Sequence, residues 1–235
     1  MALTFEKKEN RHGPYMEITG YEGWVTFLKI PSEIQGLPVR SIGRHAFDGR
    51  KDLKEIHLPD SVRSLGSFCF YNTRTLEYLS LSDSVEDYYD GVIRQCASLE
   101  EITIRCSGRS FALMKEMLED NDRAMRFHLF LPDEEIRLSF PGYALIASEN
   151  TMARTIQFAY EGGGYAYRNC VHKKEIKFRE YDRLFPFMEH DDPAFAAYIA
   201  ADRLMGLMKT LLGETDDYAL PESGPLSIAP ILRSN

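Results

Sequence analysis

The sequence predicts a mixed α and β protein, in which a short right-handed solenoid with parallel strands precedes an α+β segment. Three observations lead to this fold class. An apolar pattern recurs every 23 residues over the first hundred residues of the 235-residue chain. The period then stops near residue 106, and the rest of the chain mixes helical spacing with strand-like alternation. A repeating unit of this size that cannot bury its own apolar face is typical of stacked coils.

The repeat is clearest when residues 53–66, LKEIHLPDSVRSLG, are laid over residues 76–89, LEYLSLSDSVEDYY. Each apolar position of the first segment matches an apolar position of the second. A third copy opens at residues 99–104, LEEITI, and an earlier copy places Val39, Ile42 and Phe47 under Val62, Leu65 and Phe70. The strand of that earlier copy, FLKIP at 27–31, falls into line once a five-residue insertion at 33–37 is allowed.

The spacing L-x-x-I-x-L has a simple physical meaning. Its last two apolar residues alternate, as in a short strand that buries one face. Pro59-Asp60-Ser61 then favours a turn. We therefore expect stacked coils whose parallel strands lie near 27–30, 54–58, 77–81 and 100–104. With about three coils the stack is near the minimum for stability, so we expect it to depend on a cap.

The residues that carry this pattern resemble a known family. Residues 30–47, IPSEIQGLPVRSIGRHAF, together with LPDSV at 58–62, resemble the BspA-type leucine-rich repeat, and residues 18–23 are similar to its N-terminal cap. The resemblance covers residues 15–106 and implies a leucine-rich-repeat solenoid over residues 1–107. It also implies a role in binding, often at bacterial surfaces.

The four cysteines are expected to be reduced thiols. Positions 69, 96, 106 and 170 contain no C-x-x-C pair, so a structural zinc site is not expected. In the repeat register Cys69 shares a column with Ala46 and Val92, and Cys96 shares one with Arg50 and Thr73. Both positions predict packing inside the coils.

Residues 108–235 are predicted to form an α+β domain. Phe111, Met114 and Leu118 have helical spacing, which predicts a helix that ends at Asp120 and caps the solenoid. Asp192-Pro193 begins a C-terminal helix near 193–212, which Gly213 can end. Strands are expected at 125–131, 136–140, 156–160, 165–172 and 175–178, a short helix at 143–155, a turn at Gly162-Gly163-Gly164, and a loosely ordered tail from residue 213.

A second, weaker resemblance concerns residues 167–170 and 178–185. They are similar to sequences that follow leucine-rich repeats in some gut Firmicutes proteins of uncharacterised role. That resemblance implies no activity.

Composition and motifs argue against several functions. The chain has 28 Lys and Arg residues and 36 Asp and Glu residues, which gives a net charge of −8. An acidic protein is a poor candidate for binding the negatively charged backbone of a nucleic acid. No apolar stretch is long enough to span a membrane, and charges fill the N-terminal region where a signal peptide is apolar, so we expect a cytoplasmic protein. No P-loop, nucleophile elbow or H-E-x-x-H motif is present.

We therefore expect no catalytic residues, no cofactor and no metal. His190-Asp191-Asp192 could chelate a metal, but Asp192 already serves as the helix N-cap. Cys170 and His172 lack an obvious third group to orient them as a nucleophile pair. The open alternative is an enzyme of unknown reaction with its site in residues 108–235.

The candidate site is the concave face of the solenoid sheet, where strand residues between the buried ones point outward. They form two columns: Phe27, Glu55, Tyr78 and Glu101, and Lys29, His57, Ser80 and Thr103. We expect a non-catalytic module that binds a protein partner there, with Tyr78 as the anchor and a basic or polar partner favoured by the flanking glutamates. Two alternatives stay open: the columns are solvated or covered by the C-terminal half, and the protein is a surface adhesin.

Overall fold

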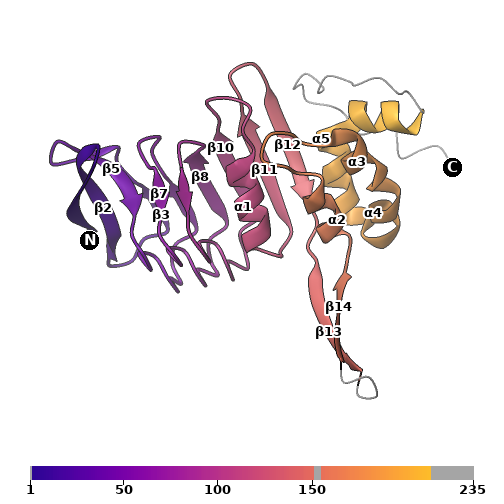
Figure 1. Cartoon of the computed structure of the whole chain (residues 1–235), viewed down its shortest axis with the longest axis horizontal. Helices are drawn as coiled ribbons and strands as arrows, with labels where there is room; N and C mark the ends of the chain where they lie inside the picture. Colours follow the sequence, from indigo (N-terminus) through magenta and orange to yellow (C-terminus); the bar gives the residue numbers. More distant parts are fainter. Residues whose placement is uncertain (1, 151–154, 213–235) are drawn as a thin grey trace.

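The chain winds through coils that build two sheets on opposite sides of one core (Figure 1). The computed structural model describes residues 2–150 and 155–212. The first sheet contains β3 (Phe27–Lys29), β6 (Glu55–His57), β8 (Tyr78–Ser82), β10 (Glu101–Arg105), β11 (Met125–Phe130) and β12 (Glu135–Phe140), adjacent in that order. The second sheet contains β1 (Ala2–Asn10), β2 (Gly13–Glu22), β5 (Leu37–Ile42), β7 (Ser64–Leu65) and β9 (Asp87–Tyr88), with β4 (Glu33–Ile34) antiparallel to β5.

The predicted strand register is confirmed. Ile56 on β6, Leu79 on β8 and Ile102 on β10 are direct partners in parallel pairs, and all three are buried. Each of the first three coils gives one strand to each sheet, so the apolar face of one coil is covered by the next. The phenylalanines of the repeat stack as well: the rings of Phe47 and Phe70 lie 5.5 Å apart with an interplanar angle of 9°.

A column of polar side chains inside the coils explains one of the cysteines. The Thr73 hydroxyl donates to the Phe47 carbonyl at 2.7 Å, and the Cys96 thiol donates to the Phe70 carbonyl at 3.0 Å. Asn121 continues the column and donates to the Ile93 carbonyl at 3.0 Å. Burial raises the pKa of the Cys96 thiol to about 12. The residue is therefore a buried donor in this column and is poorly placed to act as a nucleophile.

The fourth coil departs from the first three. After β10 the chain forms helix α1 (Ala112–Asp120) instead of a strand of the second sheet, and Met114, Met117 and Leu118 on this helix are buried. The helix is held to the preceding coil by Asp120, whose carboxylate accepts hydrogen bonds from the Ile93 amide at 2.8 Å and the Tyr88 hydroxyl at 3.0 Å. The predicted helix at this position is confirmed.

The first sheet does not end where the repeat ends. β11 pairs in parallel with β10, and β12 returns antiparallel to β11. Both strands were predicted from their alternation, but as parts of a separate domain. The division of the chain at residue 107 stays a prediction, and the backbone hydrogen bonds of this sheet run across it.

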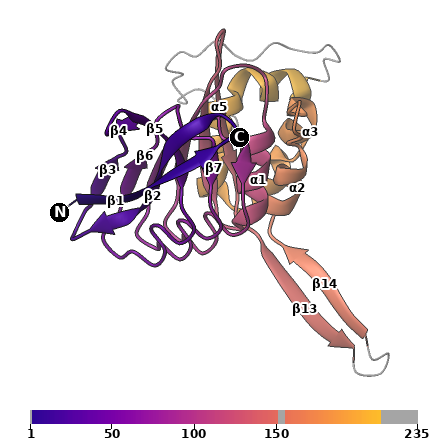
Figure 2. The same ribbon diagram turned by 60° about the vertical axis from the view of Figure 1, so that its left-hand side comes forward.

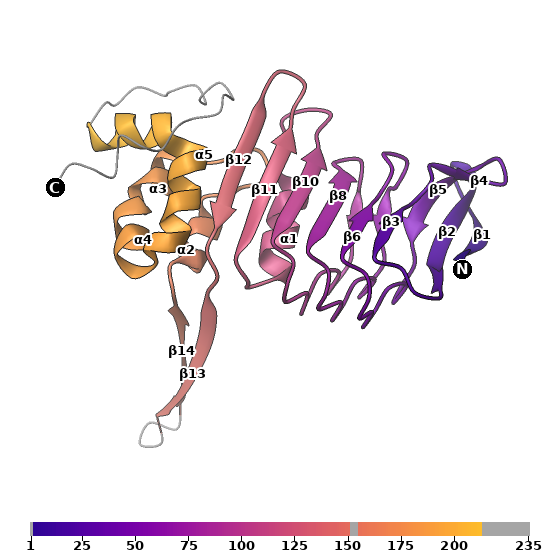
Figure 3. The same cartoon turned by 180° about the vertical axis from the view of Figure 1, so that it is seen from behind.

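The remaining elements follow β12. A two-stranded hairpin of β13 (Ala144–Asn150) and β14 (Thr155–Glu161) projects from the body (Figures 1 and 2). Four helices then pack at the end of the sheet: α2 (Gly164–Asn169), α3 (Phe178–Arg183), α4 (Phe185–Asp191) and α5 (Pro193–Leu211). α5 lies against β12 (Figure 3). Its predicted start is confirmed, because the Asp192 carboxylate accepts a hydrogen bond from the Phe195 amide at 3.0 Å.

One buried cation joins these parts. The Arg168 guanidinium on α2 donates to the carbonyls of Leu118, Asn121, Arg123, Pro141 and Gly164, which lie at the end of α1, the start of β11, the end of β12 and the start of α2. Burial lowers its pKa to about 10. Five carbonyl acceptors replace the water that a buried charge would otherwise need.

Three secondary-structure predictions were wrong. Residues 144–150 form a strand rather than a helix, because pairing with β14 outweighs the helix propensity of alanine and leucine. Residues 165–172 form no strand; α2 lies there and buries Tyr167 and Arg168, one helical turn from Gly164. Residues 175–178 contribute only an isolated bridge between Val171 and Ile176 before α3 begins. The predicted tail from residue 213 lies outside the described residues.

The glycine run at 162–164 is a tight connection rather than a loose one. Gly162 has a φ of 88°, which favours glycine, and a Cβ on Gly164 would collide with the Pro141 carbonyl. The chain can therefore pass from β14 into α2 only with glycine at this point.

The Asp120 contact makes a prediction about pH. Burial raises the pKa of the Asp120 carboxyl above its ordinary value, and its hydrogen bonds offset only part of this effect. A folded-state pKa above the unfolded one means that the stability contributed by this group falls as pH rises through that range. The stability advantage of the native chain over Asp120→Asn should therefore shrink as the pH rises from the ordinary pKa of an aspartate carboxyl through its raised value.

Urea unfolding of both proteins at several pH values measures this difference. Asp133→Asn, a change at an exposed carboxyl in the β11–β12 turn, is the control and should show no such trend. A stability difference between the native chain and Asp120→Asn that grows with pH would contradict a raised pKa for the Asp120 carboxyl.

Candidate functional site

The structure brings the eight predicted residues together on one side of the first sheet, called here the sheet face. The residues of each predicted column are direct partners on neighbouring strands. The pairing also extends both columns by one residue on β11. The first column is Phe27, Glu55, Tyr78, Glu101 and Arg126, and the second is Lys29, His57, Ser80, Thr103 and His128.

Aromatic rings form a ladder along the sheet face. The Phe27 ring lies 5.2 Å from that of His57, which lies 5.4 Å from that of Tyr78. The Tyr78 hydroxyl donates to the Thr103 hydroxyl at 2.8 Å, which fixes the ring against β10. Phe27, 55% exposed, begins the ladder near the N-terminal end of the sheet. This row offers a partner apolar area that is already held in place.

The charges on the sheet face are largely paired. His57 Nε2 lies 2.6 Å from a Glu55 carboxylate oxygen, and Arg126 lies 2.6 Å from the Glu101 carboxylate. The ion pair with Arg126 offsets the charge of Glu101, and the Glu55 carboxylate has His57 as its hydrogen-bond partner. Lys29 is exposed at the N-terminal end of the sheet.

Ser80 is the one predicted residue that lies beneath the surface. Its hydroxyl accepts a hydrogen bond from Arg105 Nη1 at 2.6 Å, and the residue is 3% exposed. The same guanidinium contacts the Asp60 carboxylate at 2.8 Å and the Leu58 carbonyl at 2.7 Å. Arg105 therefore occupies the surface above Ser80.

Helix α5 forms a wall at the end of the sheet face. The Arg126 guanidinium lies over the Tyr198 ring at 4.8 Å from its centroid, so that Glu101, Arg126 and Tyr198 form a chain from β10 to α5. A pocket of about 480 Å³, the inner pocket, lies between sheet and helix. Its polar lining residues are Tyr78, Glu101, Thr103, Arg126, His128, Arg137, Tyr198 and Asp202.

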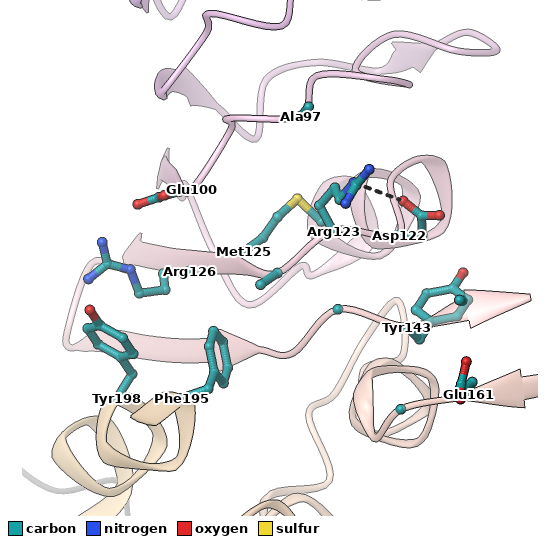
Figure 4. Close-up of a pocket in the computed structure, with 14 residues that line it drawn as sticks. Ala97, Glu100, Asp122, Arg123, Met125, Arg126, Tyr143, Glu161, Phe195 and Tyr198 are labelled. Carbon is teal, nitrogen blue, oxygen red and sulfur yellow. Dashed lines mark ion pairs between the residues drawn. The ribbon is translucent and has the colours of Figure 1, made fainter. Parts of the chain in front are cut away.

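A second pocket of about 720 Å³, the edge pocket, shares Arg126 and Tyr198 with the inner pocket. Figure 4 shows Arg126 and Tyr198 at one end of the edge pocket, and Tyr143 and Glu161 at the other. Phe195 stands beside Tyr198, at a ring distance of 5.8 Å. The two shared residues thus stand at the boundary between the sheet face and the edge of the molecule.

The polar groups of the inner pocket are already engaged with one another. The Asp202 carboxylate accepts a hydrogen bond from the Ser139 hydroxyl at 2.9 Å, and burial raises the pKa of this carboxyl. His128 Nε2 contacts Glu135. No hydrogen bond among the described residues that line the inner pocket joins a hydroxyl or thiol to a histidine.

Sequence reasoning missed the residues of β11 and α5. Alternation in residues 125–131 correctly placed Arg126 and His128 opposite the buried positions, but it did not show that β11 extends the solenoid sheet. No sequence signal places Tyr198 beside Arg126, because that contact depends on how α5 packs against β12.

Three further findings concern other kinds of site. In the part of the chain that the structure describes, no three His, Cys, Asp or Glu side chains gather closely enough to hold a metal ion. Over residues 2–150 and 155–212, no helix has the length and apolarity needed to cross a membrane. Burial also raises the pKa of the Cys170 thiol to about 12, and this thiol donates to the Ala166 carbonyl at 3.5 Å, while His172 is exposed.

Comparisons with known proteins match the repeat segment. Residues 25–113 match the model of the BspA type leucine rich repeat region, in six copies. Among solved structures, a leucine-rich repeat protein from Bacteroides ovatus is 22% identical with a TM-score of 0.38, covering 55% of this chain and 36% of that one. A leucine rich cell surface protein from Faecalibacterium prausnitzii is 20% identical with a TM-score of 0.35, covering 57% and 43%.

The T. pallidum leucine rich repeat protein is 21% identical with a TM-score of 0.29, covering 42% of this chain and 68% of that one. The chain thus matches less than half the length of the first two structures. Comparison with curated proteins gives no match. The 23-residue coils, their parallel strands and the family model agree on one identification: residues 25–113 of this chain are a BspA-type leucine-rich repeat region.

Proposed function

We propose that this protein is a non-catalytic binding module that holds a protein partner on its sheet face and in the adjoining inner pocket. One observation carries the proposal. The two outward-facing columns of side chains continue in register from β3 to β11. At β11 they end beside helix α5, whose Tyr198 contacts Arg126. Parallel sheets of repeat proteins commonly serve as binding surfaces.

The composition of this surface supports a protein partner. Tyr and Arg are the residue types most often found at binding hot spots, and Tyr78, Arg126 and Tyr198 all line the inner pocket. Hydrogen bonds and ion pairs hold Tyr78 and Arg126, so little side-chain entropy is lost when a partner binds. Since the charges are paired, a partner with apolar or aromatic side chains fits best.

We place this binding in the cytoplasm. All four cysteines of the chain are unpaired, and three of them are buried, which suits a reducing compartment. Fractionation of the native cells, followed by detection of the protein with an antibody, tests this part of the proposal. Recovery of the protein with the cell surface or the medium would contradict it and would favour adhesion instead.

The proposal predicts a loss of affinity from two single substitutions. Tyr78→Ala and Tyr198→Ala should each weaken partner binding by about 2 kcal/mol or more, because each removes an aromatic anchor at the centre of the surface. The partner is first isolated with the full-length protein, and affinities are then measured by calorimetry.

The control is Phe187→Ala, which removes an aromatic side chain 70% exposed on α4, away from the sheet face, and should leave affinity unchanged. Melting temperatures of all variants are compared as well. Tyr78→Ala loses one hydrogen bond, worth about 1 kcal/mol, so only a small decrease is expected. Unchanged affinity for both Tyr78→Ala and Tyr198→Ala would place the binding surface elsewhere.

A further inference from the structure

A second surface lies over the second sheet, between the β1–β2 turn and β9. It is a hollow of about 890 Å³, called here the arginine hollow, whose basic lining residues are Arg11, His12, Arg40, Arg44 and Arg63. Figure 2 shows the strands β1, β2, β5 and β7 that carry this region. The surface is separate from the sheet face, since the two pockets share no lining residue.

Three of these arginines have no acidic partner. Among the described residues, no carboxylate oxygen lies within 4.0 Å of the guanidinium groups of Arg11, Arg40 and Arg44. Arg11 Nε donates to His12 Nε2 at 2.9 Å, and Arg40 Nη1 reaches the His12 carbonyl at 3.5 Å. Their charges are therefore left without compensation.

The molecule as a whole carries eight more acidic than basic residues. Several other surface arginines lie close to carboxylates: Arg94 at 2.7 Å from Asp90, Arg105 at 2.8 Å from Asp60 and Arg126 at 2.6 Å from Glu101. Like charges that gather without partners repel one another, so the cluster is a site where an anion gains affinity.

Three carboxylates line the hollow, those of Glu17, Glu86 and Asp87, and none of them forms an ion pair with Arg11, Arg40 or Arg44. Glu17 accepts a hydrogen bond from the Ser41 hydroxyl at 2.9 Å and lies 3.8 Å from Lys8, outside the hollow. Glu86 lies 3.9 Å from Arg63. Both therefore have partners of their own, and the charges of Arg11, Arg40 and Arg44 stay available.

We propose that the arginine hollow binds an extended acidic peptide segment of a partner protein. Guanidinium groups present paired N–H donors that match carboxylates in a bidentate geometry. The hollow crosses the strands from β2 to β9, roughly 14 Å at the usual spacing between strands. An extended peptide covers that distance with about four residues. Alternate side chains of an extended peptide point to the same side, so acidic residues at alternate positions can face the hollow and meet the guanidinium groups from the β1–β2 turn and the β5 segment.

A peptide fits this hollow better than a nucleic acid does. Glu17, Glu86 and Asp87 also line it, and a continuous phosphate backbone would have to pass close to these carboxylates. The acidic side chains of a peptide are discrete and can be spaced to meet the arginines alone. Charge complementarity thus favours an acidic peptide.

The test uses the full-length protein and a rhodamine-labelled peptide of six consecutive glutamates, measured by fluorescence anisotropy. Binding at about 50 mM NaCl should weaken steeply as salt is raised, because exposed charges are screened. The double variant Arg40→Gln/Arg44→Gln should lose at least about tenfold in affinity. The control Arg74→Gln/Arg183→Gln removes the same charge at exposed positions outside the hollow and should lose less than about twofold.

Three comparisons separate this proposal from others. Tyr78→Ala should bind the peptide normally, since the sheet face is not involved. Unfolding curves of the double variant should match those of the native chain, which separates loss of binding from loss of fold. The proposal would be overturned if the native chain did not bind the peptide, or if both double variants lost affinity equally. It would also be overturned if a DNA duplex competed more strongly than unlabelled peptide.

Discussion

The parallel pairing of β10 with β11 is the interaction on which the rest of the structure depends. The last strand of a repeat stack leaves its backbone N–H and carbonyl groups exposed, and such an edge must be paired or covered. Here β11 pairs with that edge, β12 returns along it, and α5 lies against β12. The C-terminal helices are therefore positioned by β12, which is itself held in place because β11 pairs with the last repeat strand. The buried guanidinium of Arg168 then locks α1, β11, β12 and α2 to one another through their carbonyls.

This connection also makes the candidate site composite. The repeats supply the aromatic ladder that ends at Tyr78, while the segment after the repeats supplies Arg126 and Tyr198. Glu101, on the last repeat strand, joins the two through its ion pair with Arg126. Neither part forms the inner pocket alone. The candidate site is thus built jointly by the repeats and the segment that follows them.

The sequence was most informative where local spacing determines structure. The 23-residue period predicted the parallel strands and the columns from Phe27 to Thr103, because each coil repeats the same contacts with its neighbour. It was least informative where pairing between distant segments decides the outcome. Residues 144–150 have good helix propensity, yet they pair with β14, and Tyr198 meets Arg126 only through the packing of α5. The unpaired charges of the arginine hollow were equally invisible, because Arg11 comes from the β1–β2 turn while Arg40 and Arg44 come from β5 and the residues after it.

The central claim is that β11 and β12 belong to the same cooperative unit as the repeats. Native-state amide hydrogen exchange, measured at increasing urea concentrations, tests this most directly. The account predicts that the amides of Phe127 and Leu138 exchange with the same free energy and the same urea dependence as those of Ile56 and Leu79. Exchange of β11 and β12 at a clearly lower free energy, with β6 and β8 still protected, would show that the C-terminal part opens independently and would contradict the claim.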